Sequence, residues 1–538
     1  MEPRDGTEVT GRGAVTKLNR RDLLRVGAGG VGTVVFGIAS GCAANYVPPP
    51  NGTPFTLGVM SGLHDPDAVV LWTRLDPTQA AGTTTVSWQI ATDPAMSTVI
   101  RRGSSSADPS RDHTVKVLVE GLEPDRSYWY RFDVDGVASR VGRARTLPSP
   151  GAAVRSLSVV VASCQNWANG WYHAWKGIAA EDVDAVLWLG DYIYESGTSV
   201  LSARVDSVGE ATTLEQYRAK YRMYRSDPAL QDGHAAHPFV PVRDDHELFN
   251  DCDRFSMLQF PERAAASYQA WFDYMPVMPI DGTRVYRSYR WGDLAVIPML
   301  DSRQYRDRGA NGFQGSTKPP IVGIGDVVRE AQLPGRSMLG EEQRGWLLDT
   351  IDEAQAEGVR WKLLGNPVMM TPTRAIDLDE PGIRKLFPDL PRNEGLFINM
   401  DAWNSYLWER QLLFDHWHAN SVDSIAVLTG DIHSFWRARQ RLDMEDEASP
   451  VVATEYVTGS ISSTTPNILR TPEFGRFLES GPVQWIPRFD YVDFRHNGYG
   501  VVRATPERLD VQFRRTLATE RYASVTDGMS FSEYFSEY

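Results

Sequence analysis

Cysteine is scarce in this chain of 538 residues, which contains only three, at Cys42, Cys164 and Cys252. An odd and widely spaced set excludes a scaffold held together by disulfides, because such scaffolds use several closely placed pairs. It also argues against a zinc site built from cysteines, which needs several thiolates at close spacing. Cys164 and Cys252 can still pair with each other, although each lies beside a segment of polar residues.

Long apolar runs are missing as well. Residues 26–39 are mildly apolar but too short and too rich in glycine to span a membrane, and no later stretch qualifies. Negatively charged residues outnumber positively charged ones, and the formal net charge of -14 argues against bulk binding of polyanions but leaves room for a local basic patch. We therefore expect no specific nucleic-acid binding. Hydrophobic residues make up 42% of the chain, so it can bury a sizeable core, and its length suggests more than one domain.

Two familiar signatures of serine hydrolases are absent from the expected strand ends. We find no Asp-Ser-Ala nucleophile in a strand-to-helix setting and no Gly-x-Ser-x-Gly motif there. The second absence weakens an α/β-hydrolase interpretation. Any hydrolytic chemistry in this chain therefore does not require a covalent serine intermediate.

The N-terminal segment is typical of an export signal, which we assign to residues 1–44. It contains the twin-arginine motif Arg20-Arg21, and it ends in Ala39-Ser40-Gly41-Cys42, which is similar to a lipoprotein cleavage box. We expect the twin-arginine export machinery to carry the protein to the periplasm or the cell exterior. There Cys42 either carries a lipid anchor or lies close to a simple cleavage site. Residues 45–54, with three consecutive prolines, look like a linker.

Residues 55–148 show short strands separated by turns, which predicts an immunoglobulin-like β-sandwich. Residues 68–75 form one expected strand, and residues 85–91 alternate apolar and polar side chains as a half-buried strand does. Residues 121–132 resemble the tyrosine corner of such sandwiches. This part contains no cluster of ligand-type residues.

Residues 149–515 repeat a rhythm of strand, loop and helix, which predicts an α/β domain. We expect strands at 157–162, 186–189, 239–242, 295–300 and 424–428, and helices at 171–181, 341–356 and 406–418. Five or six of the strands end in polar clusters rich in metal-ligand residue types. The clusters begin at Cys164, Asp191, Asp244, Asp301, Asn366 and Asp431. Because the carboxyl ends of parallel strands carry the ligands of such sheets, we predict a metal site there.

The residue types at these strand ends are a mixture of soft and hard donors. A thiolate, a phenolate and carboxylates favour a trivalent iron, whereas Asp and Asn suit calcium or magnesium. Asp191 follows a strand directly, and Tyr194 lies far enough along the loop to turn back toward it. Two cations that share a bridging carboxylate would suit in-line attack on phosphorus.

Residues from about 55 to 515 resemble the PhoD-type alkaline phosphatase and phosphodiesterase family. The resemblance rests on the segments around Asp191, Asp244, Asp301, Asn366 and Asp431, and on Gly58-Val59-Met60-Ser61-Gly62 and Leu71-Trp72-Thr73-Arg74 in the leading sandwich. It implies a four-layer α/β/β/α metallophosphoesterase domain of the calcineurin-like kind, preceded by the immunoglobulin-like sandwich. It also implies export and a site that holds Fe3+ with Ca2+.

Carried onto this chain, the resemblance implies a bridging role for Asp191. Cys164 and Tyr194 would complete the iron side. By analogy with purple acid phosphatases, His433 would join the iron. The second cation would take Asp245, Asn366 and Asp431.

Three further residues are candidates for catalysis in the same set of motifs. His246 is placed to protonate the leaving oxygen or orient the phosphate, or else it is a hydrogen-bonded histidine near the sheet edge. Arg303, like Arg306, can clamp phosphate oxygens or pair with Asp301. Arg243 stands where the family usually has tryptophan, and it either adds a phosphate contact or alters substrate packing. Glu455 and the serines at 460–463 are expected to support the site.

The chain ends in Phe531, Tyr534, Phe535 and Tyr538, which are spaced as on one face of a helix. We therefore expect residues 516–538 to form an amphipathic segment. It would either dock on the core or act as a lid over the metal site.

The function implied by the resemblance is hydrolysis of phosphate mono- and/or diesters through attack of a metal-bound hydroxide. Two alternatives remain open: a phospholipase D-like phosphodiesterase of the same family, and a non-catalytic surface lipoprotein with a degenerate site. The expected substrate is a small phosphate ester, a cell-wall polymer or a phospholipid head group. We expect the protein to be a monomer.

Overall fold

The structure is a computed structural model that describes residues 53–78, 82–199, 202–311, 322–323, 325–377, 381–386, 388, 395–444, 446–466, 473, 476 and 489–534. The expected export signal 1–44, with Arg20, Arg21 and Cys42, lies outside these residues, as does most of the linker 45–54. No helix in the described ranges has both the length and the hydropathy that crossing a membrane requires. Cys164 and Cys252 are buried free thiols and do not pair.

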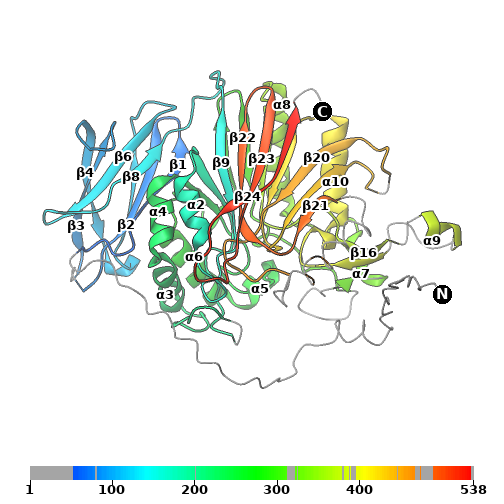
Figure 1. The fold of residues 1–538 in the computed structure, drawn as a ribbon, viewed down its shortest axis with the longest axis horizontal. Coiled ribbons are helices and arrows are strands. Elements are labelled where there is room, and N and C mark those ends of the chain that lie inside the picture. The colour runs from blue at the N-terminus through cyan, green and yellow to red at the C-terminus, as the bar shows by residue number, and fades with distance from the viewer. Residues whose placement is uncertain are drawn as a thin grey trace, which may run out of the picture. The chain divides into compact units, whose positions relative to one another are not determined.

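The N-terminal part is a sandwich of two small sheets, drawn in blue and cyan in Figure 1. The three-stranded sheet has the order β1 (Val59–Asp65), β2 (Ala68–Arg74), β5 (Thr114–Val119). The five-stranded sheet consists of β4 (Val99–Ala107), β3 (Thr84–Ala91), β6 (Ser127–Val134), β7 (Val137–Ala138) and β8 (Gly142–Arg145), which pairs with β6. Inward residues of both sheets, such as Leu71, Ile90 and Tyr130, form one core.

The tyrosine corner of the sandwich is confirmed. The hydroxyl of Tyr128 donates to the carbonyl oxygen of Glu123 at 3.2 Å and accepts the Glu123 N–H at 2.9 Å. Because both bonds return to the backbone five residues upstream, they fix the turn into β6.

The first large sheet has six strands in the order β11-β10-β9-β22-β23-β24. Their bounds are β11 (Phe239–Val242), β10 (Ala185–Leu189), β9 (Leu157–Ala162), β22 (Asn497–Ala504), β23 (Arg508–Thr516) and β24 (Thr526–Tyr534). The strands β9, β10 and β11 are parallel, whereas β22 pairs antiparallel with β9 and opens an antiparallel meander. The expected strands at 157–162 and 239–242 are confirmed with the same bounds.

The second large sheet has seven strands in the order β12-β13-β15-β18-β20-β19-β21. Their bounds are β12 (Arg287–Trp291), β13 (Ala295–Met299), β15 (Trp361–Asn366), β18 (Ile425–Thr429), β20 (Val451–Val457), β19 (Phe435–Arg441) and β21 (Phe489–Asp493). The central four, β13, β15, β18 and β20, are parallel. Antiparallel strands at both edges complete the sheet.

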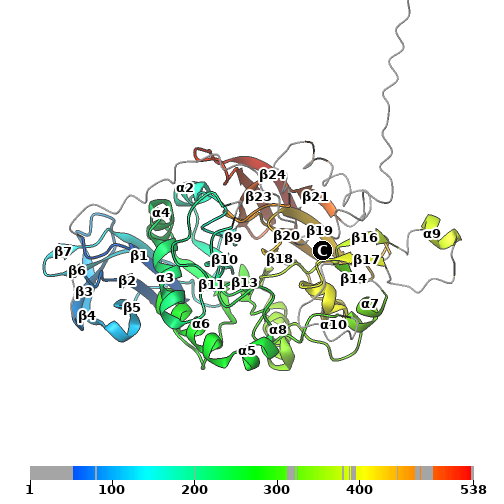
Figure 2. The same cartoon turned by 90° about the horizontal axis from the view of Figure 1, so that it is seen from below.

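Helices cover the outer face of each large sheet, as Figures 1 and 2 show. The first sheet is covered by α2 (His173–Ala180), α3 (Leu214–Arg225), α4 (Pro228–Ala236) and α6 (Pro261–Tyr274). The second is covered by α8 (Gly340–Ala356) and α10 (Leu407–Ala419). Shorter elements are η1 (Pro109–Arg111), α5 (Arg254–Gln259), α7 (Asp326–Ala331), α9 (Pro381–Leu386), η2 (Trp403–Ser405) and a small sheet of β14 (Val322–Gly323), β17 (Gly395–Ile398) and β16 (Arg374–Asp377).

Strand β9 shows why the central strands are mostly apolar. Val160 and Ala162 face α2 and its neighbouring helices, whereas Val159 and Val161 face the second sheet. Because side chains alternate between the two faces and both faces are covered, the run from Val159 to Ala162 is apolar, and the one polar residue of the strand, Ser158, is only half-buried. Together with the core between α8, α10 and the second sheet, these contacts make four layers. The expected α/β/β/α domain behind an all-β sandwich is confirmed.

The helical conformation that the aromatic spacing indicates near the C-terminus is wrong for residues 526–534. Residues Thr526–Tyr534 form β24, which pairs antiparallel with β23. Phe531 packs against Tyr456, Tyr491 and Phe513 on the sheet, and Phe535 and Tyr538 lie outside the described residues. For Phe531 and Tyr534 the helical spacing gave way to pairing with an available strand edge, a tertiary interaction that local spacing does not encode. With Phe531 held in the sheet, its aromatic ring contributes to the core and not to a lid.

Candidate metal centre

Ligand-type side chains follow the carboxyl ends of strands in both large sheets. Cys164 comes after β9, Asp191 after β10 and Asp245 after β11, while Asn366 ends β15 and Asp431 follows β18. Since β9 to β11 are parallel and β15 is parallel to β18, each sheet brings its strand ends to one edge.

The first group of donors contains Cys164, Asp191 and His433, whose ligand atoms lie within 4.8 Å of one another. Tyr194 joins them, because its hydroxyl donates to Asp191 Oδ2 at 2.8 Å and lies 3.1 Å from His433 Nε2. His433 Nδ1 lies 3.0 Å from the carbonyl oxygen of Thr464. A carbonyl only accepts, so Nδ1 carries the proton and Nε2 is left with its lone pair toward the group.

Two further groups extend the site. Asp191, Asp245 and His246 form one, and Asp245, Asp251 and Asp401 form the other, each within 4.8 Å. Asp191 belongs to the first two groups and Asp245 to the last two. The donors therefore form a continuous series in which these two carboxylates are the shared members.

The backbone at these positions is strained. Cys164, Asp191, Asp431 and His433 have φ values of 59°, 58°, 65° and 54°, in the left-handed region that non-glycine residues rarely adopt. Each such residue costs on the order of 1–3 kcal/mol and persists where the surroundings impose it. The concentration of such conformations at strand ends indicates a site selected for its geometry at the expense of local stability.

Gly190, the residue before Asp191, allows β10 to end close to β11. It has a φ of 99°, and a Cβ placed on it would lie 2.4 Å from Asp244 Cβ and 2.6 Å from Asp244 N. Only glycine tolerates both the angle and the approach. This contact brings the loop after β10 beside the loop that carries Asp244 and Asp245.

Negative charge is crowded in the site. Burial, and after it the neighbouring carboxylates Asp245 and Asp244, raise the pKa of Asp191 well above its usual range. Burial and Asp244 likewise raise the pKa of Asp431, and burial and Asp191 raise the pKa values of the Cys164 thiol and the Tyr194 phenol. Burial lowers the pKa of His433 to about 4, which keeps the imidazole neutral. A bound cation would relieve the crowding, because all of these groups bind metals in their deprotonated or neutral forms.

Arg303 is the internal counter-charge of this acidic site. Its side chain is 2% exposed and contacts Asp244 through Nε and, at 3.1 Å, through Nη2. Nη1 donates to Asp401 at 2.5 Å, while Nη2 lies 3.7 Å from Asp245 and 3.9 Å from Asp431. Burial opposes ionisation of Asp245, but Arg303 and His246 together hold its pKa below the usual range.

The alternative pairing of Arg303 and Arg306 with Asp301 is wrong. Arg306 donates to Asp401 Oδ1 at 2.6 Å, to the Asp401 carbonyl at 2.8 Å and to the Cys252 carbonyl at 3.0 Å. Asp301 instead accepts the backbone N–H groups of Arg303 and Gln304 at 3.1 and 3.0 Å. The Asp301 carboxylate accepts the backbone N–H groups of the turn that follows it, so it is not available to the guanidinium groups of Arg303 and Arg306.

His246 belongs to the second donor group, with Asp191 and Asp245. Its Nδ1 is 2.7 Å from Glu195 Oε2, its ring centroid is 4.0 Å from that of Tyr194, and its backbone N–H donates to Asp191 at 3.3 Å. Burial favours the neutral ring, but Asp245, Asp191 and Glu195 raise its pKa well above the ordinary value. Glu195 therefore orients the imidazole and stabilises its protonated form.

Arg243 and Asn366 lie less directly in the site. Arg243 is buried against α6, where Nη2 donates to Ser267 Oγ at 2.7 Å and the guanidinium covers the Tyr268 ring at 3.8 Å. The structure thus directs it into the helix packing and not toward a phosphate. Asn366 Nδ2 donates to the Val368 carbonyl at 2.5 Å, and its Oδ1 accepts the Trp403 indole N–H at 3.2 Å.

Several contributing residues were not singled out as site residues from the sequence. Asp401 and Asp251 complete the third carboxylate group, and Asp244 holds Arg303. Ser463, from the expected supporting run, donates to the Tyr194 hydroxyl oxygen at 2.7 Å. Glu455 accepts the N–H groups of Met370 and Thr371 beneath β15. Asp244, at a strand end, and Asp251, beside Asn250 in a polar loop, carried a local signal, whereas Asp401 carried none.

Known proteins with the same architecture identify the family. The family described as PhoD-like phosphatase matches residues 159–513, and its N-terminal domain matches residues 41–148. Alkaline phosphatase D of Bacillus subtilis (strain 168) is 32% identical over 543 residues, which cover 95% of this chain and 87% of that protein.

Solved structures agree. The structure of PhoD is 30% identical, with a TM-score of 0.79, and covers 91% of this chain and 92% of its own. A purple acid phosphatase, PPD1 from yellow lupin (Lupinus luteus), shares the fold. It is 12% identical, with a TM-score of 0.50, and the match covers 88% of this chain and 73% of that chain. The chain therefore belongs to the PhoD-like phosphatase family and is a phosphate-ester hydrolase.

Proposed function

We propose that this protein is an alkaline phosphatase of the D type that hydrolyses phosphate mono- and/or diesters with the help of Fe3+ and Ca2+. One observation carries the proposal. The thiol of Cys164, the phenol of Tyr194 and the imidazole of His433 meet at Asp191, and Asp191 also belongs to a second group that contains only carboxylates and an imidazole. Two unlike sets of donors that share one carboxylate suit two unlike cations.

The donor chemistry fits these ions. Cys164, Tyr194, His433 and Asp191 supply anionic and imidazole donors of the kind that ferric iron takes. Asp245 and Asp431 supply the hard carboxylate oxygens that calcium prefers, and Asn366 supplies an amide oxygen, with Asp251 and Asp401 as further acids beside Asp245. When bound, the cations supply Lewis acidity and activate water for attack on phosphorus.

The protein's own groups then divide the remaining work. Tyr194 is fixed by Ser463 and Asp191, and His433 is fixed by the Thr464 carbonyl, so both present their donor atoms without reorganisation. Glu195 holds a protonated His246 beside Asp191. From there His246 can deliver a proton to the leaving alcohol. Arg303 keeps Asp244, Asp245 and Asp401 in place and limits their mutual repulsion.

Metal analysis with a visible spectrum of the purified protein tests this proposal. Thiolate and phenolate on ferric iron give a charge-transfer band, so we expect a coloured protein that contains iron and calcium and hydrolyses aryl phosphate esters. Cys164→Ala and Tyr194→Phe should each shift the band, since each removes one anionic donor. Cys252→Ala is the matched control, because Cys252 is an equally buried thiol that belongs to none of the three donor groups and whose Sγ donates to the Asp245 carbonyl oxygen at 3.8 Å. A colourless zinc protein would contradict the assignment.

We further propose that the protein is exported by the twin-arginine machinery through the Arg20-Arg21 motif. Replacing both arginines by lysine should retain the protein in the cytoplasm, and fractionation with an antibody against the mature part would measure it. Mass spectrometry of the exported N-terminus would distinguish a lipid on Cys42 from simple cleavage nearby. Export of the double-lysine variant at the normal level would exclude this route.

A further inference from the structure

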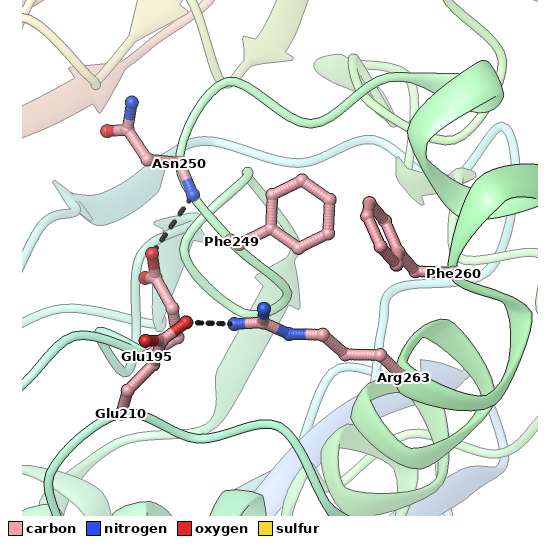
Figure 3. Close-up of a pocket in the computed structure, with 6 residues that line it drawn as sticks. All are labelled: Glu195, Glu210, Phe249, Asn250, Phe260 and Arg263. Carbon is pink, nitrogen blue, oxygen red and sulfur yellow. Dashed lines mark hydrogen bonds and ion pairs between the residues drawn. The ribbon is translucent and has the colours of Figure 1, made fainter.

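A pocket of about 250 Å³ opens beside the candidate metal centre (Figure 3). It is lined by Glu195, Glu210, Phe249, Asn250, Phe260 and Arg263. None of these residues belongs to the three donor groups described above.

The pocket shares a wall with the centre at two points. Glu195 binds His246 through Oε2 at 2.7 Å and the Asn250 N–H through Oε1 at 3.1 Å. The residue after Asn250 is Asp251, whose N–H donates to Asp245 at 2.5 Å. The pocket therefore borders the centre on the side of His246, where the alcohol portion of a bound ester has a neighbouring space to occupy.

Two aromatic rings form the opposite wall. Phe249 and Phe260 meet edge to face, with ring centroids 5.9 Å apart and an interplanar angle of 87°, and the Arg263 guanidinium lies 4.9 Å from the Phe249 ring. Figure 3 shows both rings on the same side of the pocket as Arg263. Phe260 is 47% exposed, although it follows directly on α5, so a large apolar surface is left at the mouth.

The charged groups of the pocket already have partners, some of them outside the pocket. Arg263 donates to the Tyr217 hydroxyl oxygen and the Ala211 carbonyl, both at 2.9 Å, and to Glu210 at 3.3 Å. Both carboxylate oxygens of Glu195 are used, as described above. With two acids and one paired cation, the pocket repels a second phosphate and favours an uncharged group.

We propose that this pocket is a subsite for the alcohol portion of the ester, and that it selects an uncharged aromatic ring. The inference rests on the proposed function and specifies the substrate class of the same site. The ring packs against Phe249 and Phe260, where aromatic pairs gain more than their buried area alone provides. The volume is sufficient, because a cavity of about 150 Å³ holds a benzene ring.

Kinetics with three phosphate monoesters of similar leaving-group basicity test the proposal: benzyl, cyclohexylmethyl and ethyl phosphate. For Phe260→Ala and Phe249→Leu we expect kcat/KM for benzyl phosphate to fall about tenfold, the size of one aromatic contact. The value for ethyl phosphate should stay unchanged, and that for cyclohexylmethyl phosphate should fall less than that for benzyl phosphate. Leu258→Ala is the matched control, because Leu258 is 76% exposed on α5 and does not line the pocket.

The outcomes separate the subsite from the function on which it rests. If the wild-type protein with iron and calcium hydrolysed none of the three esters, the proposed function would fail and the subsite with it. If all three were hydrolysed and the variants changed them by the same factor, the subsite alone would be overturned. An equal loss for the benzyl and cyclohexylmethyl esters would overturn the selection of an aromatic ring.

Discussion

Asp191→Asn should lower kcat/KM for phosphate esters by at least about 1,000-fold, the scale on which metal and electrostatic stabilisation of the transition state acts. Asp191 is the one residue shared by the thiol-containing group and the His246 group. An amide keeps the shape of the side chain but removes the negative charge that two cations would share. Iron and calcium content should therefore fall together in this variant, as elemental analysis of the purified protein would show.

The same substitution should not destabilise the metal-free protein. Burial and the carboxylates of Asp245, Asp244 and Glu247 together disfavour the charge of Asp191 more than His246 favours it. Loss of that charge offsets the weaker hydrogen bond from Tyr194, so the Tm in the presence of a chelator should stay the same or rise. Asp352→Asn, at a surface carboxylate 2.8 Å from His416, is the control for the chemical change itself. Full metal content in Asp191→Asn would exclude the bridging role.

Arg303→Met should lower the free energy of unfolding of the metal-free protein by about 3–5 kcal/mol, the cost of leaving buried charges without a partner. The guanidinium contacts Asp244 and Asp401 directly, and it lies within 4 Å of Asp245 and Asp431. Methionine fills a similar volume without the charge, so the loss reports electrostatics more than packing. Arg303→Lys should cost less, because it keeps the charge and loses only the planar fork of donors.

Chemical denaturation in the presence of a chelator would measure this effect, with Arg308→Met as the matched control. Arg308 is an exposed arginine in the same segment, and its guanidinium lies 5.3 Å from the centre of the Phe255 ring. Bound cations should reduce the loss for Arg303→Met, because they supply part of the missing positive charge. If the two methionine variants lost equal stability, Arg303 would not be the counter-charge of the site.

The strands that carry the donors could be predicted because their patterns are strong. Residues 157–162 are apolar except for Ser158 and are followed by a polar run, which marks a strand covered on both faces. Cys164, Asp191, Asp245 and His433 could then be placed near one another by the rule that parallel strands end at a common edge.

Other parts of the site have no such local pattern. Asp401 follows the short strand β17 of a separate small sheet and reaches the centre through Arg303 and Arg306. Arg243 stands beside the two acids in the sequence, yet α6 captures its guanidinium. In both cases the partner is distant along the chain, and its position depends on how the layers pack.

The C-terminal strand was missed for a similar reason. The aromatic spacing fits a helix, but Thr526–Tyr534 finds a strand edge at β23. The energy of that pairing comes from a neighbour and not from the segment itself.

Strand β9, which carries Cys164 at its end, has β10 on one side and β22 on the other. Val161 pairs with Gly500, so one edge of β9 stays open on the ribosome until the chain has been synthesised beyond Gly500. Open strand edges invite pairing between chains. The first sheet is therefore completed only after β22 has emerged, and a nascent chain arrested before β22 would expose this edge to its neighbours. The sheet whose strand ends carry Cys164, Asp191 and Asp245 thus depends on a strand that follows all three residues in the sequence.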